Sequence, residues 1–227
     1  FVDASGPVTV DLLLGTASGA GLGSDTLVAI ENIYGSNFGD ALSGDDNANQ
    51  VFGNDGGDTI AGHAGDDSLY GLTGNDSLSG GTGADSLYGG NDDDTLSGGD
   101  GADTLSGGDG NDTLVGGPGD DALQGEGGND TVVYAGSRDQ YLLGKSAFGY
   151  PTVTSVNDGK DGLFSIERLT FADARVAFDV AAGQKVTGAI FPHPDGAVME
   201  EFSLAEAGTQ KVTVALKAGR LYRLTLA

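Results

Sequence analysis

The chain has 227 residues, no cysteine and a formal net charge of −24 at pH 7. The absence of cysteine excludes disulfides and thiol chemistry, and the negative charge argues against nucleic acid or an anionic membrane as a direct partner. No apolar run approaches the roughly 18 residues that a membrane span requires, and no cleavable signal peptide is visible. Because the first residue is Phe1, we expect a piece of a longer protein.

Residues 1–34 are predicted to form an N-terminal cap. Residues 7–14 have the composition of a strand that opens with Pro7 at a sheet edge. Residues 20–28 look like a degenerate copy of the repeat that follows, with Asp25 as one candidate ligand. Residues 29–34 then interrupt the period, which is typical of the irregular end of a repeat protein.

Residues 35–133 repeat a nine-residue pattern eleven times, Gly-Gly-x-Gly-x-Asp-x-U-x, where U is a large aliphatic residue. We number the repeat positions one to nine. Position one is always Gly, position four usually is, position eight is always aliphatic, and position six is Asp in ten of eleven copies. This pattern predicts a turn followed by a three-residue strand, and such short strands must stack on neighbouring coils.

Two repeats, or eighteen residues, are predicted to close one coil of an all-β parallel β-roll or β-helix solenoid with irregular β caps. The position-six side chains then form two rows on opposite edges. One row contains Asp40, Asp58, Asp76, Asp94, Asp112 and Asp130. The other row contains Asn49, Asp67, Asp85, Asp103 and Asp121.

Stacked carboxylates about 4.8 Å apart repel each other unless cations lie between them. The tract holds 20 acidic residues and no Lys or Arg, so without a cation it is expected to be disordered. A hard dication with oxygen ligands fits, and Ca²⁺ in about nine gaps at most would nearly neutralise the tract. Bound calcium should lower the pKa values of the position-six carboxylates. Further candidate ligands are Asp55, Asn91, Asp100 and Asp109, and the backbone carbonyls of Gly53, Gly62, Gly71, Gly80, Gly89, Gly98, Gly107 and Gly116.

The tract resembles the repeats-in-toxin (RTX) β-roll of bacterial proteins exported by type I secretion. The resemblance implies calcium bound between turns, a chain that is unfolded in the cytosol, and a partner in the type I secretion machinery. It also implies a secreted or cell-surface location. Phe38 and Asp92 depart from the glycine at position four, and Asn49 from the aspartate at position six. The gaps near the start of the roll are therefore expected to be weak or empty.

Residues 134–180 are predicted to form a C-terminal β cap, because the glycine rhythm stops and aromatic residues appear. Ile166-Glu167 repeats the Ile30-Glu31 pair, and Glu167 with Arg168 is interpreted as a surface pair. Residues 212–216 and 221–226 alternate like strands, so 181–227 is expected to contain a β-hairpin, as the start of another module or a natural terminus.

No catalytic set or further cofactor site is apparent in the sequence. His63 is at a variable repeat position, His193 is in a proline-rich turn, and neither has an acidic partner at zinc-motif spacing. The favoured function is a calcium-binding structural module of a larger exported protein, and not an enzyme. The alternatives are a polysaccharide-binding module and a self-assembling surface-layer or adhesin segment, and a parent enzyme with an upstream catalytic domain stays possible.

Overall fold

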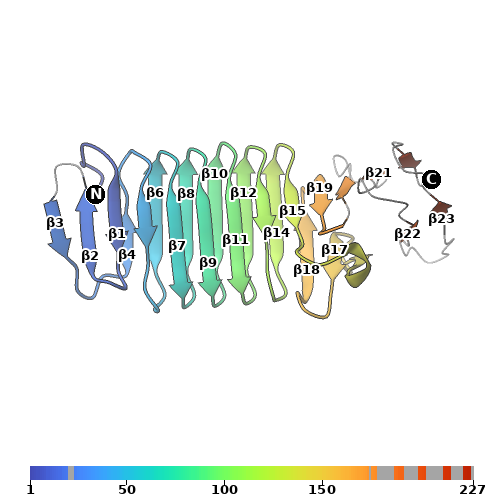
Figure 1. Cartoon of the computed structure of the whole chain (residues 1–227), viewed down its shortest axis with the longest axis horizontal. Coiled ribbons are helices and arrows are strands. Elements are labelled where there is room, and N and C mark those ends of the chain that lie inside the picture. Colours follow the sequence, from blue (N-terminus) through green and yellow to red (C-terminus); the bar gives the residue numbers. More distant parts are fainter. Residues whose placement is uncertain are drawn as a thin grey trace.

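The computed structural model describes residues 1–19, 23–173, 175–177, 187–191, 199–202, 212–215 and 222–225. The described repeat region is an elongated roll whose strands lie side by side, across its long axis (Figure 1). Two long sheets form its walls, and the remaining two described strands, β22 (Met199–Phe202) and β23 (Val212–Ala215), pair with each other.

The first wall, here called sheet A, contains the strands that follow every second turn, and both ends of it are extended by antiparallel strands. Its strands are β1 (Val8–Asp11), β2 (Thr16–Gly19), β3 (Gly23–Thr26), β5 (Ala41–Ser43), β7 (Thr59–Ala64), β9 (Ser77–Thr82), β11 (Thr95–Asp100), β13 (Thr113–Val115), β15 (Thr131–Val133), β19 (Arg168–Thr170), β20 (Arg175–Ala177), β21 (Thr187–Phe191) and β24 (Tyr222–Thr225).

The opposite wall, sheet B, contains the strands that follow the alternate turns. Its strands are β4 (Asn32–Tyr34), β6 (Gln50–Asp55), β8 (Ser68–Thr73), β10 (Ser86–Asn91), β12 (Thr104–Asp109), β14 (Ala122–Gly127), β16 (Leu142–Lys145), β17 (Pro151–Thr154) and β18 (Lys160–Phe164). A single 3₁₀ turn, η1 (Arg138–Gln140), is the helical element of the described residues.

The parallel register between neighbouring strands is eighteen residues throughout the repeats. Leu87 of β10 lies opposite Leu69 of β8 on one side and Leu105 of β12 on the other. The predicted two-repeat coil is therefore confirmed. The predicted three-residue strand is too short for most copies, since β10 runs for six residues. The first three positions of the following repeat also pair with the coil two repeats away, which leaves positions four to six as the turn.

The position-eight side chains form one buried stack between the two walls. Val51, Leu69, Leu87, Leu105 and Leu123 from sheet B have no measurable exposure. The position-eight residues of sheet A, which complete the stack, are Leu42, Ile60, Leu78, Leu96, Leu114 and Val132. Because positions seven and nine point outward on each strand, the interior consists of one aliphatic side chain per repeat.

The N-terminal cap differs from the predicted degenerate coil. β1 pairs in parallel with β5, but β2 and β3 add to it in antiparallel order. Asp25 lies in β3 with an exposed side chain, and it is not stacked on any position-six residue. Residues 20–22 of the predicted degenerate repeat lie outside the described residues. A spacing match over one copy could not distinguish a coil from an antiparallel strand.

One row of aromatic side chains lies on the outer face of sheet B, at position nine. Tyr34, Phe52, Tyr70 and Tyr88 are eighteen residues apart, and neighbouring rings stack with centroids 4.6–5.0 Å apart and planes within 10° of parallel. These contacts reinforce the register of the first four strands of sheet B from outside the core.

After the last repeat, β16, β17 and β18 form an antiparallel meander, and β18 then rejoins sheet B in parallel beside β14. Further on, β23 pairs with β22, and β24 pairs with β21. The predicted hairpin between residues 212–216 and 221–226 is therefore wrong, because alternation identifies a strand but not its partner. No helix in the described part of the chain is long and apolar enough to cross a membrane.

Candidate calcium-binding turns

The position-six carboxylates form two ladders of hydrogen bonds, one along each edge of the roll. Asp76 Oδ1 accepts the backbone N–H of Asp58 at 2.7 Å, and the N–H of Asp76 donates to Asp94 Oδ1 at 2.8 Å. Asp85 is connected in the same way to Asp67 and Asp103 on the opposite edge. Nine such bonds, 2.7–2.9 Å long, link the eleven repeats. Each carboxylate therefore has one oxygen directed at the coil before it.

The second carboxylate oxygen has no protein partner in most turns. Nine buried Oδ2 atoms of the described residues are unpartnered, and all belong to position-six aspartates. They are those of Asp58, Asp67, Asp76, Asp85, Asp94, Asp103, Asp112, Asp121 and Asp130. These side chains are at most 4% exposed. A buried, unpaired carboxylate oxygen is costly, so the arrangement requires a cation, a proton or water at each turn.

The glycine at position one makes room for this oxygen. A Cβ on Gly53 would collide with Asp58 Oδ2 and would lie 2.8 Å from the carbonyl oxygen of Gly71, one coil further on. The same pairing of an unpartnered Oδ2 with a following-coil carbonyl recurs along both edges. The carbonyls of this kind are those of Gly71, Gly80, Gly89, Gly98, Gly107 and Gly116. The carbonyls of Gly53 and Gly62 lie in the same way beside Asp40 Oδ2 and Asn49 Oδ1, but these two oxygens have protein partners.

The first turn on each edge differs because its polar atoms already have partners. Asp40 Oδ2 accepts the N–H of Ser36 at 2.6 Å, and its Oδ1 accepts the N–H of Val8 at 2.7 Å. Asn49 Oδ1 accepts the N–H of Asp45 at 2.7 Å, and its Nδ2 donates to the Asp45 carboxylate. These two turns therefore have no free buried oxygen.

Burial raises the pKa values of the nine carboxylates that have an unpartnered Oδ2. It raises those of Asp76 and Asp94 to about 7, and neighbouring carboxylates add to the rise. Burial likewise raises the pKa of Asp130, where the positive charge of Arg168 opposes the rise. The predicted direction was the opposite, because it assumed calcium beside each carboxylate. The raised pKa values describe the protein without a cation, and a bound dication would act against them.

Most gaps therefore offer carboxylate and carbonyl oxygens, without sulfur or nitrogen. This donor set fits a hard cation such as Ca²⁺. No three His, Cys, Asp or Glu side chains converge among the residues described. The position-three candidates have exposed side chains at strand ends. They are Asp55, Asn91, Asp100 and Asp109.

Two carboxylates that sequence analysis did not place in the ladders continue them. The N–H of Asp121 donates to Asp161 Oδ1 at 3.2 Å, and the N–H of Asp130 donates to Glu167 Oε2 at 2.8 Å. Glu167 was interpreted as half of a surface pair, but its carboxylate instead follows the last aspartate of one row. The echo of Ile30-Glu31 in Ile166-Glu167 was the available signal for this position.

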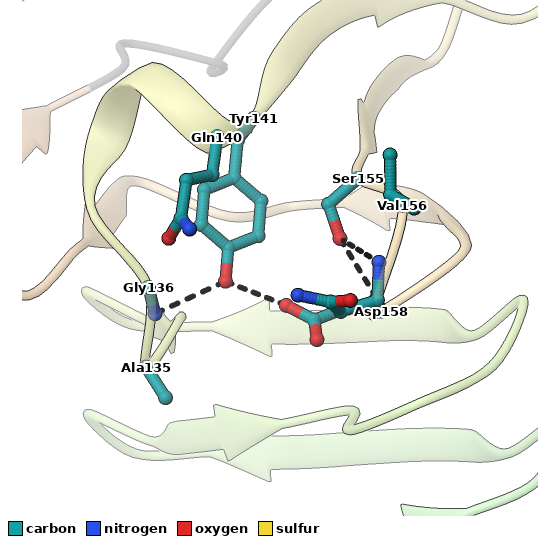
Figure 2. Close-up of a pocket in the computed structure, with 8 residues that line it drawn as sticks. Ala135, Gly136, Gln140, Tyr141, Ser155, Val156 and Asp158 are labelled. Atoms are coloured by element: carbon teal, nitrogen blue, oxygen red, sulfur yellow. Dashed lines mark hydrogen bonds between the residues drawn. The ribbon is translucent and has the colours of Figure 1, made fainter.

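The histidines do not contribute to the ladders. His63 is exposed and its Nε2 lies 2.7 Å from Ser43 Oγ, while His193 lies outside the described residues. A pocket in the described part of the chain is formed in the C-terminal cap, around Tyr141 and Asp158 (Figure 2).

No curated protein matches the chain. The family model of the RTX calcium-binding nonapeptide repeat, which covers four copies at a time, matches residues 34–69, 70–105 and 106–141. Repeats of this family form calcium-binding structural modules, and proteins that carry them are typically secreted. The matched stretches cover the stacked coils from β5 to β15 and both rows of carboxylates, and they extend through η1 of the C-terminal cap. Residues 34–141 of this chain thus belong to the RTX calcium-binding repeat family, and the strands of this stretch from β5 to β15 form the β-roll.

Proposed function

We propose that this chain is a calcium-triggered folding module of a larger secreted or cell-surface bacterial protein. The observation that carries the proposal is the set of nine buried, unpartnered carboxylate oxygens, which lie beside position-one glycines and, in most gaps, a following-coil carbonyl. The nine position-six aspartates with an unpartnered Oδ2 supply the side-chain ligands, and position-one carbonyls supply backbone ligands. The proposal assigns no reaction to the chain.

The electrostatics explain why folding would depend on calcium. Ionised carboxylates about 5 Å apart repel each other by roughly 3 kcal/mol per pair at an effective dielectric constant of about 20. Many such pairs along two edges outweigh the stability of an ordinary domain, which is about 5–15 kcal/mol. A cation in each gap turns this repulsion into attraction, so its binding free energy becomes folding free energy.

The same linkage suits export. Extracellular calcium modules bind at about 10⁻⁴ to 10⁻³ M, well above the calcium level inside cells. The acidic tract would therefore stay unfolded before export, in a form that a type I secretion channel can thread. Folding would follow contact with calcium outside the cell.

Circular dichroism of the chain in chelator and in millimolar calcium tests the proposal. We expect little regular structure in chelator and a β spectrum in calcium, with magnesium far less effective because it demands near-ideal octahedral geometry. A β-rich spectrum in chelator that calcium leaves unchanged would refute the proposal.

A further inference from the structure

A segment of the C-terminal cap has the register of another repeat. Residues 156–164, Val-Asn-Asp-Gly-Lys-Asp-Gly-Leu-Phe, place Leu163 opposite Leu123 in the parallel pairing of β18 with β14. Asp161 is therefore at position six and Gly159 at position four. Gly159 has φ +74°, and a Cβ there would collide with the carbonyl of Gly119, just as a Cβ on Gly119 would collide with that of Gly101. The excursion through β16 and β17 displaces this copy from the nine-residue period.

Aromatic hydroxyl groups hold this displaced turn in place, although Val156 replaces the glycine of position one. Tyr134 donates to Asp161 Oδ2 at 2.8 Å. Figure 2 shows that the Tyr141 hydroxyl donates to Asp158 Oδ2, at 2.6 Å, and accepts the N–H of Gly136, at 3.1 Å. Asp161 is 1% exposed, so its carboxylate is as buried as those of the repeats.

The other edge ends in a comparable way. Thr131 of β15 lies opposite Arg168 of β19, which places Glu167 after Asp130 in the row. A Cβ on Gly125 would collide with both Asp130 Oδ2 and the carbonyl of Ser165. This is the relation that Gly53 has to Asp58 and Gly71. The longer glutamate reaches the ladder from a turn of only three residues, 165–167.

The unpartnered oxygens indicate which gaps are prepared for a cation. In the nine repeats that have a free Oδ2, Oδ1 is directed at the preceding coil and Oδ2 lies beside the position-one glycine. In seven of them, all but those of Asp112 and Asp121, the missing Cβ of that glycine also faces a carbonyl that follows on the same edge. Asp121 and Asp130, which are 4% and 0% exposed, retain free Oδ2 atoms, although no repeat of the uninterrupted tract follows them on their edges. Asp40 and Asn49 have no free oxygen. There are nine free oxygens and nine gaps within the repeats, but the two sets do not match. The gaps begin at Asp40 and Asn49, whereas the free oxygens begin one coil later and end at Asp121 and Asp130, each facing a gap to the cap.

We propose that the calcium rows extend into the cap, with one Ca²⁺ between Asp121 and Asp161 and another between Asp130 and Glu167. The gaps from Asp40 to Asp58 and from Asn49 to Asp67 are the weak ones. The inference rests on the proposed function. The positive charge of Arg168 makes the Glu167 gap the weaker of the two terminal sites.

The test counts calcium ions bound to the full chain by native mass spectrometry in saturating calcium. Asp161→Asn and Glu167→Gln remove charge with little change in size, and we expect each to lose one ion and the double variant to lose two. Tyr134→Phe removes a hydrogen bond to Asp161 but no charge, so it should retain every ion. Asp40→Asn, at the other end of the roll, should also retain every ion.

The outcomes separate the cap sites from calcium binding in general. An unsubstituted chain that binds no calcium would refute the proposed function itself. Calcium binding in which Asp40→Asn loses an ion while Asp161→Asn and Glu167→Gln lose none would overturn only the extension into the cap. Equal loss in Tyr134→Phe and Asp161→Asn would assign the effect to cap packing and would also overturn it. The Asp40→Asn comparison remains decisive if the cap variants fold poorly.

Discussion

Replacing one carboxylate in the middle of a row should destabilise the fold in calcium and stabilise it in chelator. Asp76 Oδ1 accepts the N–H of Asp58 at 2.7 Å, while its Oδ2 is buried and unpartnered on the side of the following coil. Asp76→Asn keeps the size and the Oδ1 acceptor but removes the charge. Both gaps that flank Asp76 on its own edge should therefore bind calcium more weakly, and the Asp85 edge should be unaffected.

The magnitude follows from linkage. At a calcium concentration 100 times the dissociation constant, each bound ion stabilises the fold by about 2.7 kcal/mol. Loss of one ion should therefore cost about that amount, and loss of both about 5 kcal/mol. In chelator the same substitution should stabilise the fold, because it removes the charge of a buried carboxyl group whose pKa burial has raised to about 7. Calcium titrations followed by circular dichroism should show a higher midpoint for the variant, with equal or greater residual structure in chelator.

An anomalous calcium map of the same variant locates the loss. We expect reduced density in the Asp58–Asp76 and Asp76–Asp94 gaps and full density along the Asp85 edge. Asp92→Asn is the matched control, because Asp92 is exposed and adds only its charge to the surroundings of Asp76 and Asp94. Equal effects of the two substitutions, or loss of ions beside Asp85, would show that the ladders do not act as separate rows.

Three other predictions concern the core, the titration and the turns. Leu87→Asp should prevent folding, because an unpaired charge in the stack costs several kcal/mol, whereas Leu72→Asp, at an exposed position, should fold normally as judged by its calcium midpoint. Without calcium the roll should be less unstable at pH 5 than at pH 8, because the penalty from raised carboxylate pKa values such as that of Asp76 is lost as pH falls towards 3.8. The calcium concentration needed for half-maximal folding should rise from pH 8 to pH 5, because protons compete with calcium for the carboxylates. A calcium midpoint that does not change between these pH values would contradict carboxylate ligation. Gly101→Ala should raise the calcium midpoint more than Gly127→Ala, because Gly101 has φ +145° and faces a backbone carbonyl, whereas the nearest neighbour of Gly127 is a side-chain oxygen.

The repeat period predicted the roll because two independent constraints share it. A buried aliphatic such as Leu87 and a turn carboxylate such as Asp85 recur every nine residues, and only a stacked coil satisfies both. Asp161 could not be placed in this way. A chain excursion separates it from the repeats and Val156 stands where glycine is expected, so its position depends on tertiary contacts made by Tyr134 and Tyr141.

Other features left different traces in the sequence. The aromatic row on sheet B was detectable, since Tyr34, Phe52, Tyr70 and Tyr88 are eighteen residues apart. A nine-residue consensus does not show this row, because position nine is aromatic only in alternate repeats. The positive φ at position two was detectable only in part, because the second glycine of the consensus indicates it but several copies adopt it without glycine. Leu72 adopts φ +87°, a conformation that side chains such as leucine rarely favour, because the surrounding coils impose it.

The eighteen-residue register makes the pair of nonapeptides, and not the single one, the unit by which such a roll can change length. Removal of residues 98–115 would join two segments that already face the same way, and every downstream side chain would keep its wall and its edge. Removal of residues 98–106 alone would transfer everything after the cut to the opposite wall, and would turn the C-terminal cap by half a revolution about the long axis relative to β1–β3. Natural insertions and deletions in rolls of this kind should therefore accumulate in even numbers of repeats wherever both ends of the roll carry partners whose relative orientation matters.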